Sequence, residues 1–279
     1  MAHLNLAKKN QGKRKISLRY FYSKLANVLL SFLCCGLDRP RFIGVGSSKK
    51  FGVINQDAFL IMKKLGIKEA KMSIVGYLDF ALAEKAAEQF SESQAKQNLA
   101  LKYNLNLNKK NIIIYSSSFN AKDAKLFSNE EQIAYYKEII KTIREVFSEQ
   151  EANILFKIHP SESIDFYKSL EQYGVKIYGK EVKNEELILL SDLYIAHYST
   201  TNFTAMILQK PAIFLNLLKA EAVEITRELF GIKEYVKEKE KFKQLLSDFK
   251  NNRLQAQYEL SDNIYTANSL EKILNWIEN

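Results

Sequence analysis

Short apolar runs rich in β-branched residues alternate with segments of helical periodicity along the chain beyond residue 42. Strands that are apolar throughout must be covered on both faces, which is typical of a parallel sheet joined by helical crossovers. The alternation therefore predicts an α/β fold with a parallel sheet and helices on both faces, most clearly over residues 71–279. The predicted strands are Ser73–Gly76, Asn111–Tyr115, Asn153–Ile158, Val175–Tyr178, Leu193–Ala196 and Ala212–Leu215.

The helices between these strands are also visible in the sequence. The clearest covers Asn129–Phe147, where Tyr136, Ile139 and Ile143 share one face. Ser128, followed three residues later by Glu131, predicts a capping box at its start. Further helices are predicted over Ser163–Tyr173, Asn184–Leu190, Thr201–Leu208, Ala220–Phe230, Glu238–Lys250 and Ala267–Ile277.

The positive charge of the chain is concentrated at its amino-terminal end. The formal net charge is +9, and residues 1–42 hold nine Lys or Arg against the single acid Asp38. The rest of the chain carries 32 basic and 31 acidic side chains. Because the main domain has no basic bias of its own, nucleic-acid binding is not expected of it.

Residues 1–42 are expected to form a basic and apolar segment separate from the domain after it. The stretch Leu25–Cys35 has roughly helical apolar spacing, but it is too short to span a bilayer and no cleavage pattern comes after it. Two alternatives remain open: peripheral contact with a membrane surface, or packing of this segment on protein. The adjacent Cys34 and Cys35 are poorly placed to bridge each other, which fits a reducing cytoplasm.

The carboxyl ends of three predicted strands carry polar clusters, and ligands of open α/β sheets bind at this edge. The first cluster, Ser116-Ser117-Ser118, comes directly after Asn111–Tyr115. Small hydroxyl side chains there would leave backbone N–H groups open to an anion or a sugar ring. The alternative is an ordinary serine-rich turn.

The second cluster comes after Asn153–Ile158 and contains His159, Pro160 and Glu162. A histidine at the end of a buried strand projects into the crevice, and Pro160 restricts the chain where it leaves the strand. The imidazole could then donate a hydrogen bond to a ribose, a phosphate or a leaving oxygen. A histidine that only satisfies a neighbouring carbonyl is the alternative.

The third cluster comes after Leu193–Ala196 and begins with His197. Ser199, Thr200 or Thr201 could cap the helix that starts there, and several free N–H groups would then point into the crevice. Such an arrangement can hold a phosphate. The alternative is a capped helix without a ligand.

Several other kinds of site are excluded or disfavoured. Gly44-Val45-Gly46 lacks the third glycine of a dinucleotide fingerprint, and the sequence has neither a Walker loop nor a Gly-x-Ser-x-Gly elbow. Three histidines and two adjacent cysteines give no ligand spacing for a transition metal. Neither a metal nor a cofactor is expected.

The order of these clusters resembles a known family. A hydroxyl-rich strand end, then "FKIHPSES", then "LYIAHYSTTNFTAMILQKPAIFLN" is similar to the carboxy-terminal nucleotide-binding domain of GT-B glycosyltransferases of bacterial surface polysaccharide synthesis. The nearest group contains sialyltransferases, polysialyltransferases and CDP-glycerol glycerophosphotransferases. The helix and strand of "LIMKKLGIKEAKMSIVGYLDF" extend the resemblance over about residues 43–279. The resemblance implies a Rossmann-like nucleotide-sugar-binding domain there, similar to the second half of a GT-B enzyme.

The resemblance also implies roles for the strand-end residues. His159 would contact the nucleotide and act in catalysis, while Ser199 and Thr200 would hold its phosphate. The remaining expected donor-binding residues are Ser116, Ser117, Pro160, Glu162, His197 and Thr201.

The expected function is transfer of a sugar from a nucleotide-sugar, with CMP as the first guess, to a cell-surface glycan or glycolipid by a metal-independent enzyme. A GT-B enzyme has two such domains, and the residues before 43 are too few for the first. A separate amino-terminal domain or a homo-oligomer is therefore expected as a partner. The alternatives are a non-catalytic nucleotide-binding or interaction module and a nucleotide-sugar epimerase or hydrolase. The expected location is the cytoplasm, with or without peripheral contact at the inner membrane.

Overall fold

The computed structural model describes residues 49–89, 93–117, 119, 128–224, 227 and 230–278. Residues 52–279 form one compact unit. The predicted segment 1–42 and its boundary at residue 43 lie outside the described residues.

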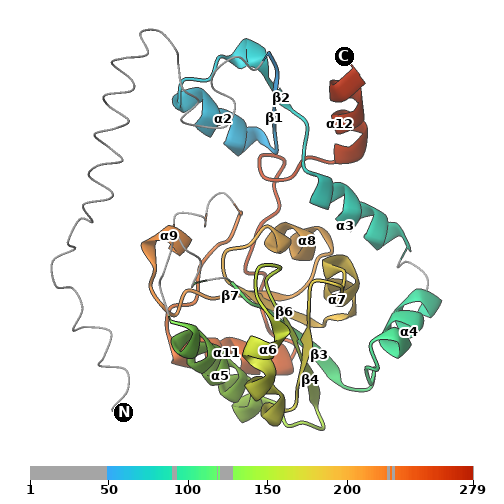
Figure 1. Ribbon diagram of the computed structural model, residues 1–279, viewed down its shortest axis with the longest axis vertical. Helices are drawn as coiled ribbons and strands as arrows, with labels where there is room; N and C mark the ends of the chain where they lie inside the picture. The colour runs from blue at the N-terminus through green and yellow to red at the C-terminus, as the bar shows by residue number, and fades with distance from the viewer. Residues whose placement is uncertain are drawn as a thin grey trace, which may run out of the picture. The chain divides into compact units, whose positions relative to one another are not determined.

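The main sheet has five strands in the order β5-β4-β3-β6-β7, and every neighbouring pair is parallel. Figure 1 shows this sheet with helices on both of its faces, so the predicted α/β, Rossmann-like class is confirmed. The strands lie within two residues of their predicted limits at each end. They are β3 (Lys110–Tyr115), β4 (Ala152–Lys157), β5 (Val175–Tyr178), β6 (Leu193–Ala196) and β7 (Ala212–Phe214).

The first predicted strand does not belong to the main sheet. Instead, β2 (Met72–Ile74) pairs with β1 (Phe51–Val53) in a two-stranded sheet. The expectation that Ser73–Gly76 joins the parallel sheet is therefore wrong. The run is short, and Gly76 at its end adopts a positive φ of 84°, so the chain turns away there rather than continuing as a strand.

Helices cover both faces of the main sheet. On one face α5 (Asn129–Val146) packs beside α11 (Lys239–Lys250), with α6 (Ile164–Tyr167) and η3 (Lys168–Tyr173) next to α5. On the other face α7 (Asn184–Leu190) and α8 (Thr201–Ile207) pack against α3 (Leu78–Gln89), and α4 (Ser93–Lys102) contacts α7. The remaining elements are α2 (Gln56–Lys64), η2 (Glu69–Lys71), α9 (Glu221–Glu224) and α12 (Ser269–Glu278).

Two predicted helices differ from the structure, and two observed helices were not predicted. The predicted helix Ser163–Tyr173 is divided into α6 and the 3-10 helix η3, which ends at the left-handed Gly174. In the region predicted as Ala220–Phe230, α9 ends at Glu224, and residues 225, 226, 228 and 229 lie outside the described residues. The helices α3 and α4 were not predicted, because α3 is alanine-rich and α4 is polar, with little apolar periodicity in either.

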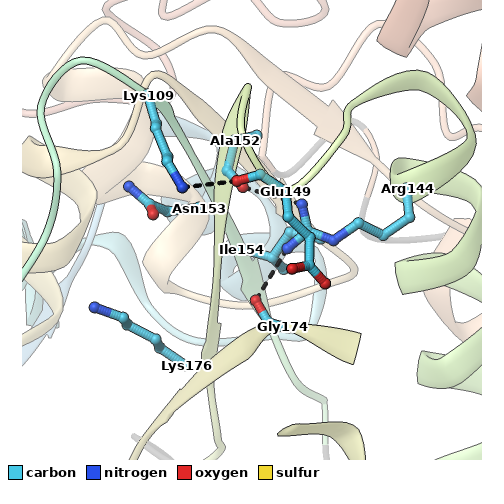
Figure 2. A pocket seen from close by; sticks show the side chains of 8 residues that line it. All are labelled: Lys109, Arg144, Glu149, Ala152, Asn153, Ile154, Gly174 and Lys176. Carbon is cyan, nitrogen blue, oxygen red and sulfur yellow. Dashed lines mark hydrogen bonds between the residues drawn. The ribbon is translucent and has the colours of Figure 1, made fainter. Parts of the chain in front are cut away.

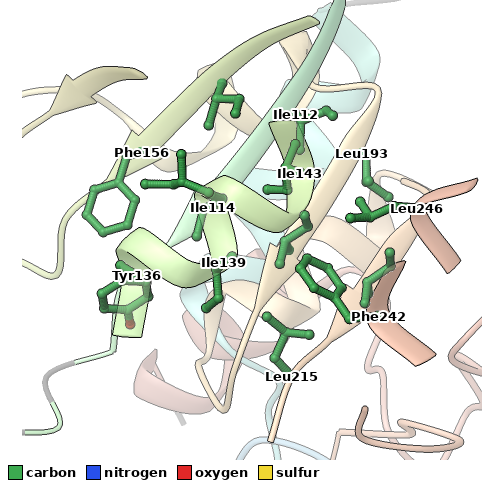
Figure 3. Close-up of a cluster of buried hydrophobic side chains, with 14 of the residues drawn as sticks. Ile112, Ile114, Tyr136, Ile139, Ile143, Phe156, Leu193, Leu215, Phe242 and Leu246 are labelled. Atoms are coloured by element: carbon green, nitrogen blue, oxygen red, sulfur yellow. The ribbon is translucent and has the colours of Figure 1, made fainter. Parts of the chain in front are cut away.

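The sheet separates two apolar cores. Figure 3 shows the core beneath α5 and α11, where side chains of β3, β4 and β6 meet the two helices. Ile112, Ile114 and Phe156 contribute from the strands, and Ile139 and Phe242 contribute from the helices; all are at most 1% exposed. At about 25 cal/mol per Å² of buried apolar surface, burial of this kind is the main stabilising contribution to the fold. It also fixes the strands whose ends form the candidate site.

No helix within the described ranges is both long and apolar enough to cross a bilayer.

Candidate functional site

The direction of strand addition reverses between β3 and β6. From β3 the chain moves outward to β4 and β5, and then returns to the other side of β3 for β6 and β7. The helix after β3, α5, covers one face, whereas the helix after β6, α8, belongs to the core of the other face. Such a reversal opens a crevice at the carboxyl ends of the two strands. All three predicted polar clusters lie at this edge of the sheet.

The ends of β3 and β4 are joined by hydrogen bonds through Ser116. Its hydroxyl accepts the backbone N–H of His159 at 2.7 Å and donates to Glu162 Oε2 at 2.5 Å. Glu162 Oε2 also accepts the His159 N–H at 3.1 Å. The structure therefore brings together three residues that the sequence placed in two separate clusters.

The imidazole of His159 is exposed and its orientation is set locally. Its Nδ1 accepts the backbone N–H of Ser161 at 3.2 Å and lies 2.7 Å from the Ser161 hydroxyl. With Nδ1 used as an acceptor, neutral imidazole carries its proton on Nε2. The ring can then donate from Nε2 to a ligand oxygen at the edge of the sheet. Pro160 is next to it on the exposed surface.

The backbone N–H groups of Ser116 and Ser117 at the end of β3 are not open. Ser116 N–H donates to Lys157 O at 2.9 Å, and Ser117 N–H donates to the buried Tyr136 hydroxyl at 2.7 Å. The expectation that these groups are free for an anion is wrong, because β4 and α5 supply acceptors that the local sequence does not reveal. Ser118 lies outside the described residues.

His197 lies inside the protein. It is 1% exposed, and its ring lies against Phe119, Tyr135 and Tyr136, with Nε2 placed 2.7 Å from the Tyr135 hydroxyl. Burial lowers the pKa of His197 to about 3, so the ring is neutral at physiological pH. A direct contact between His197 and the donor stays a prediction.

The loop from Ser199 to Thr201 has internal hydrogen bonds. The Ser199 hydroxyl accepts the Thr201 N–H at 3.3 Å, and the Asn202 and Phe203 N–H groups donate to the carbonyls of Ser199 and Thr200, both at 3.1 Å. The expectation of several free N–H groups is wrong for these three amides, because the first turn closes on itself. Three hydroxyls also lie here: that of the exposed Thr200, and those of the partly buried Ser199 and Thr201, which are hydrogen-bonded to each other at 2.8 Å.

Buried partners that sequence analysis missed hold this loop in place. Asn202 donates to the His197 carbonyl at 2.8 Å, and the Tyr194 hydroxyl lies 2.8 Å from both Asn202 Oδ1 and Thr201 Oγ1. Burial raises the pKa of Tyr77, and the charge of the neighbouring Asp79 raises it further.

A buried lysine ends β4. Lys157 is 3% exposed and its Nζ donates to Gly179 O at 2.5 Å, just beyond β5. Burial lowers its pKa from the ordinary lysine value. This bond joins the ends of β4 and β5 beside the His159 loop.

A hollow of about 130 Å³ lies at the opposite edge of the sheet (Figure 2). It is lined by Lys109 and Lys176 near the amino ends of β3 and β5, and by Arg144 from the last turn of α5. The Arg144 guanidinium donates to the carbonyls of Ala152 at 3.0 Å and Gly174 at 2.9 Å. Arg144 is engaged in holding the backbone, and the hollow lies away from the carboxyl ends of the strands, so it is not the candidate site.

Within the described ranges, no three His, Cys, Asp or Glu side chains are grouped so that they could hold a metal ion.

Residues 66–220 match the protein family described as CDP-glycerol:poly(glycerophosphate) glycerophosphotransferase. The chain belongs to this family. The matched region contains β3, β4 and β6 and all three of the polar clusters at their ends. No curated protein matches the chain closely enough in sequence to be counted as a relative.

Solved structures of the same fold include a wall teichoic acid polymerase and a UDP-GlcNAc 2-epimerase. The wall teichoic acid polymerase TagF, in a structure soaked with CDPG, has a TM-score of 0.57 at 16% identity, covering 85% of this chain and 61% of that one. The Staphylococcus aureus protein MnaA in complex with UDP has a TM-score of 0.57 at 15% identity, covering 82% and 60%. A UDP-GlcNAc 2-epimerase of Methanocaldococcus jannaschii has a TM-score of 0.53 at 18% identity, covering 82% and 61%. The chain thus spans about three fifths of the length of these structures.

Proposed function

We propose that this chain is the donor-binding part of a transferase that uses a cytidine-nucleotide-activated donor and extends a bacterial cell-surface glycan. The family match carries this proposal, because it covers the strand-end clusters themselves and its description names a CDP-linked donor. The fold likeness does not separate a polymerase from an epimerase, since the TagF and UDP-GlcNAc 2-epimerase structures have TM-scores of 0.57 and 0.53.

Two transfer reactions fit the proposal. With CDP-glycerol, an acceptor hydroxyl attacks the phosphorus that carries glycerol, and the bond from that phosphorus to the bridging oxygen breaks. With a CMP-linked sugar, the hydroxyl attacks the anomeric carbon instead, as the resemblance to sialyltransferases would imply. In both cases CMP leaves with the bonding electron pair and the acceptor loses its proton to a base. Family membership favours the first reaction.

In either reaction the protein must stabilise negative charge on the departing CMP. We assign this role to His159, whose Nε2–H is available as a donor, and to the hydroxyls of Ser199 and Thr200. The neighbouring Ser116, Ser117, Pro160, His197 and Thr201 are proposed to shape the donor site. The acceptor is proposed to be a glycan or glycolipid, and no cofactor or metal is assigned a role.

Calorimetric titration with CMP, CDP, UDP and GDP tests the proposal. We expect selective binding of the cytidine nucleotides and at least tenfold weaker binding by His159→Ala, while the exposed control Gln172→Ala binds normally. Equal binding of UDP would instead favour an epimerase or hydrolase of nucleotide sugars, which product analysis would identify. No binding of any nucleotide would contradict the proposal.

A non-catalytic nucleotide-binding or interaction module is the second candidate. It would need only the nucleotide site at the strand ends, which the family match covers. In that case a separate amino-terminal domain or a second copy would complete the site. Nucleotide binding without CMP release, from CDP-glycerol or a CMP-sugar with an acceptor present, would support the module.

We also propose a cytoplasmic location with peripheral membrane contact through residues 1–42, because that segment holds nine basic side chains against one acid. Sedimentation with anionic vesicles at low and high salt tests this contact. Deletion of residues 1–42 should abolish salt-sensitive binding, and unchanged binding would contradict the idea.

A further inference from the structure

The carboxylate of Glu162 accepts four hydrogen bonds from the protein. Oε2 accepts the Ser116 hydroxyl at 2.5 Å and the His159 N–H at 3.1 Å. Oε1 accepts the Gln132 amide at 2.5 Å and the Tyr167 hydroxyl at 2.8 Å. An ionised carboxylate offers about four acceptor positions, so these bonds use them all.

The four donors come from different parts of the fold. Ser116 is next to the end of β3, His159 lies just beyond β4, Gln132 is in the first turn of α5 and Tyr167 ends α6. Gln132 and Tyr167 are fully buried, and the two side chains are also hydrogen-bonded to each other. The carboxylate thus ties the His159 loop to three other elements.

The side-chain amide of Gln132 is oriented toward the Glu162 carboxylate. Its Nε2 faces Glu162 and also donates to Ser117 O at 3.3 Å, whereas its Oε1 is buried with no hydrogen-bond partner within the described part of the chain. A buried amide oxygen without a partner is unfavourable and rare. The reverse orientation would direct that oxygen at the carboxylate, so Glu162 determines how the amide lies.

We infer that Glu162 is a positioning residue rather than a donor-binding one, and that Gln132 and Tyr167 act with it to hold the His159 loop against Ser116. Because its acceptor positions are occupied, Glu162 affects the ligand through the placement of His159. The inference rests on the proposed function in assigning His159 to the nucleotide, but the arrangement itself exists without a ligand.

The test combines a spectroscopic measurement on ligand-free protein with nucleotide titration. Glu162→Gln keeps the side-chain size but puts an NH₂ group where donors converge, and Tyr167→Phe removes only the hydroxyl. We expect both variants to shift the ¹H and ¹⁵N imidazole signals of His159, assigned by their loss in His159→Ala. We expect both to weaken CMP binding about tenfold. The exposed Glu171→Gln and the nearby Tyr173→Phe are matched controls that should change neither quantity.

The outcomes separate this inference from the proposed function. Unchanged His159 signals in both variants would overturn it. Loss of CMP affinity without any change in those signals would also overturn it, because Glu162 would then contact the ligand directly. Shifted signals in a protein that binds no nucleotide would support positioning and contradict the proposed function. If Glu162→Gln does not fold, the milder Tyr167→Phe still decides the question.

Discussion

His197 Nε2 and the Tyr135 hydroxyl form a 2.7 Å hydrogen bond beneath the strand-end loop. The imidazole is 1% exposed, and its Nδ1 has no partner in the part of the chain that the structure describes. Burial lowers the pKa of His197 to about 3 and raises that of Tyr135. Both groups are therefore neutral in the folded protein at pH 7, and charging the histidine would cost stability.

The protein should lose stability in acid because of His197. The folded-state pKa of about 3 lies below the ordinary value of 6.5, so between these values the unfolded state binds one more proton. Stability from this group is complete above about pH 6.5 and falls as the pH decreases toward 3, by about 1.4 kcal/mol per pH unit. Urea unfolding at pH 7 and pH 5 measures this loss of stability.

Two variants isolate this effect. His197→Gln keeps a polar group near Tyr135 but cannot gain a proton, so its loss of stability between pH 7 and pH 5 should be about 2 kcal/mol smaller than in the unaltered protein. Tyr135→Phe should keep the full pH dependence, because burial rather than this bond lowers the histidine pKa. The assignment fails if His197→Gln retains the original difference.

Gly76→Ala should destabilise the protein strongly. Gly76 has φ of 84°, and an added Cβ would lie 1.9 Å from the hydroxyl oxygen of the buried Ser269. The control Gly66→Ala has the same kind of backbone strain, with φ of 92°, but nothing lies within 4 Å of its added Cβ. We expect a cost of about 1–2 kcal/mol for Gly66→Ala and a larger one for Gly76→Ala.

Thermal unfolding of the two glycine variants and of Gly76→Ala combined with Ser269→Gly provides the test. The double variant should recover part of the lost stability, because the clash is removed while the backbone strain remains. Equal melting temperatures for Gly66→Ala and Gly76→Ala would show that the contact with Ser269 carries no cost.

Ser128→Ala should weaken the start of α5. The Ser128 hydroxyl accepts the Glu131 N–H at 3.2 Å, and the Glu131 carboxylate accepts the Ser128 N–H at 2.8 Å. Loss of such a cap costs about 1 kcal/mol, or about 2–4 °C in Tm for a domain of this size. Ser163→Ala is the control, since Ser163 precedes α6 without a side-chain cap bond. Identical Tm values for the two variants would contradict the expectation.

Tyr136→Phe should lower the free energy of unfolding, because it leaves a buried backbone N–H without an acceptor. The Ser117 N–H donates to that hydroxyl at 2.7 Å, and both residues are buried. The change leaves the N–H without its partner, at a cost of about 1–3 kcal/mol in the free energy of unfolding. Tyr173→Phe, made at a partly buried tyrosine of η3, should have little effect in the same denaturant titration. A loss below about 0.5 kcal/mol for Tyr136→Phe would mean that water replaces the phenol.

The sequence by itself determined the strands of the main sheet and most of the helices that cover it. Val175–Tyr178 and Leu193–Ala196 lie where they were predicted, and Ser128 caps α5 as expected. These features depend on residues close together in the sequence: an apolar run, a helical period, or a cap three residues from its partner. The sequence also placed His159 at the end of β4 for the same reason.

Only the tertiary structure decided which partners the polar groups at the strand ends bind and which of them are buried. The acceptor for the Ser117 N–H is 19 residues away, and the carboxylate that accepts the Ser116 hydroxyl is 46 residues away. The burial of Gln132 could have been predicted, because it lies four residues before Tyr136 on the buried face of α5. Its hydrogen-bond acceptors are set by packing. The neutral state of His197 likewise results from the aromatic rings around it. Hydrogen bonds and burial join residues distant in sequence, so local periodicity could place these side chains but not determine their partners.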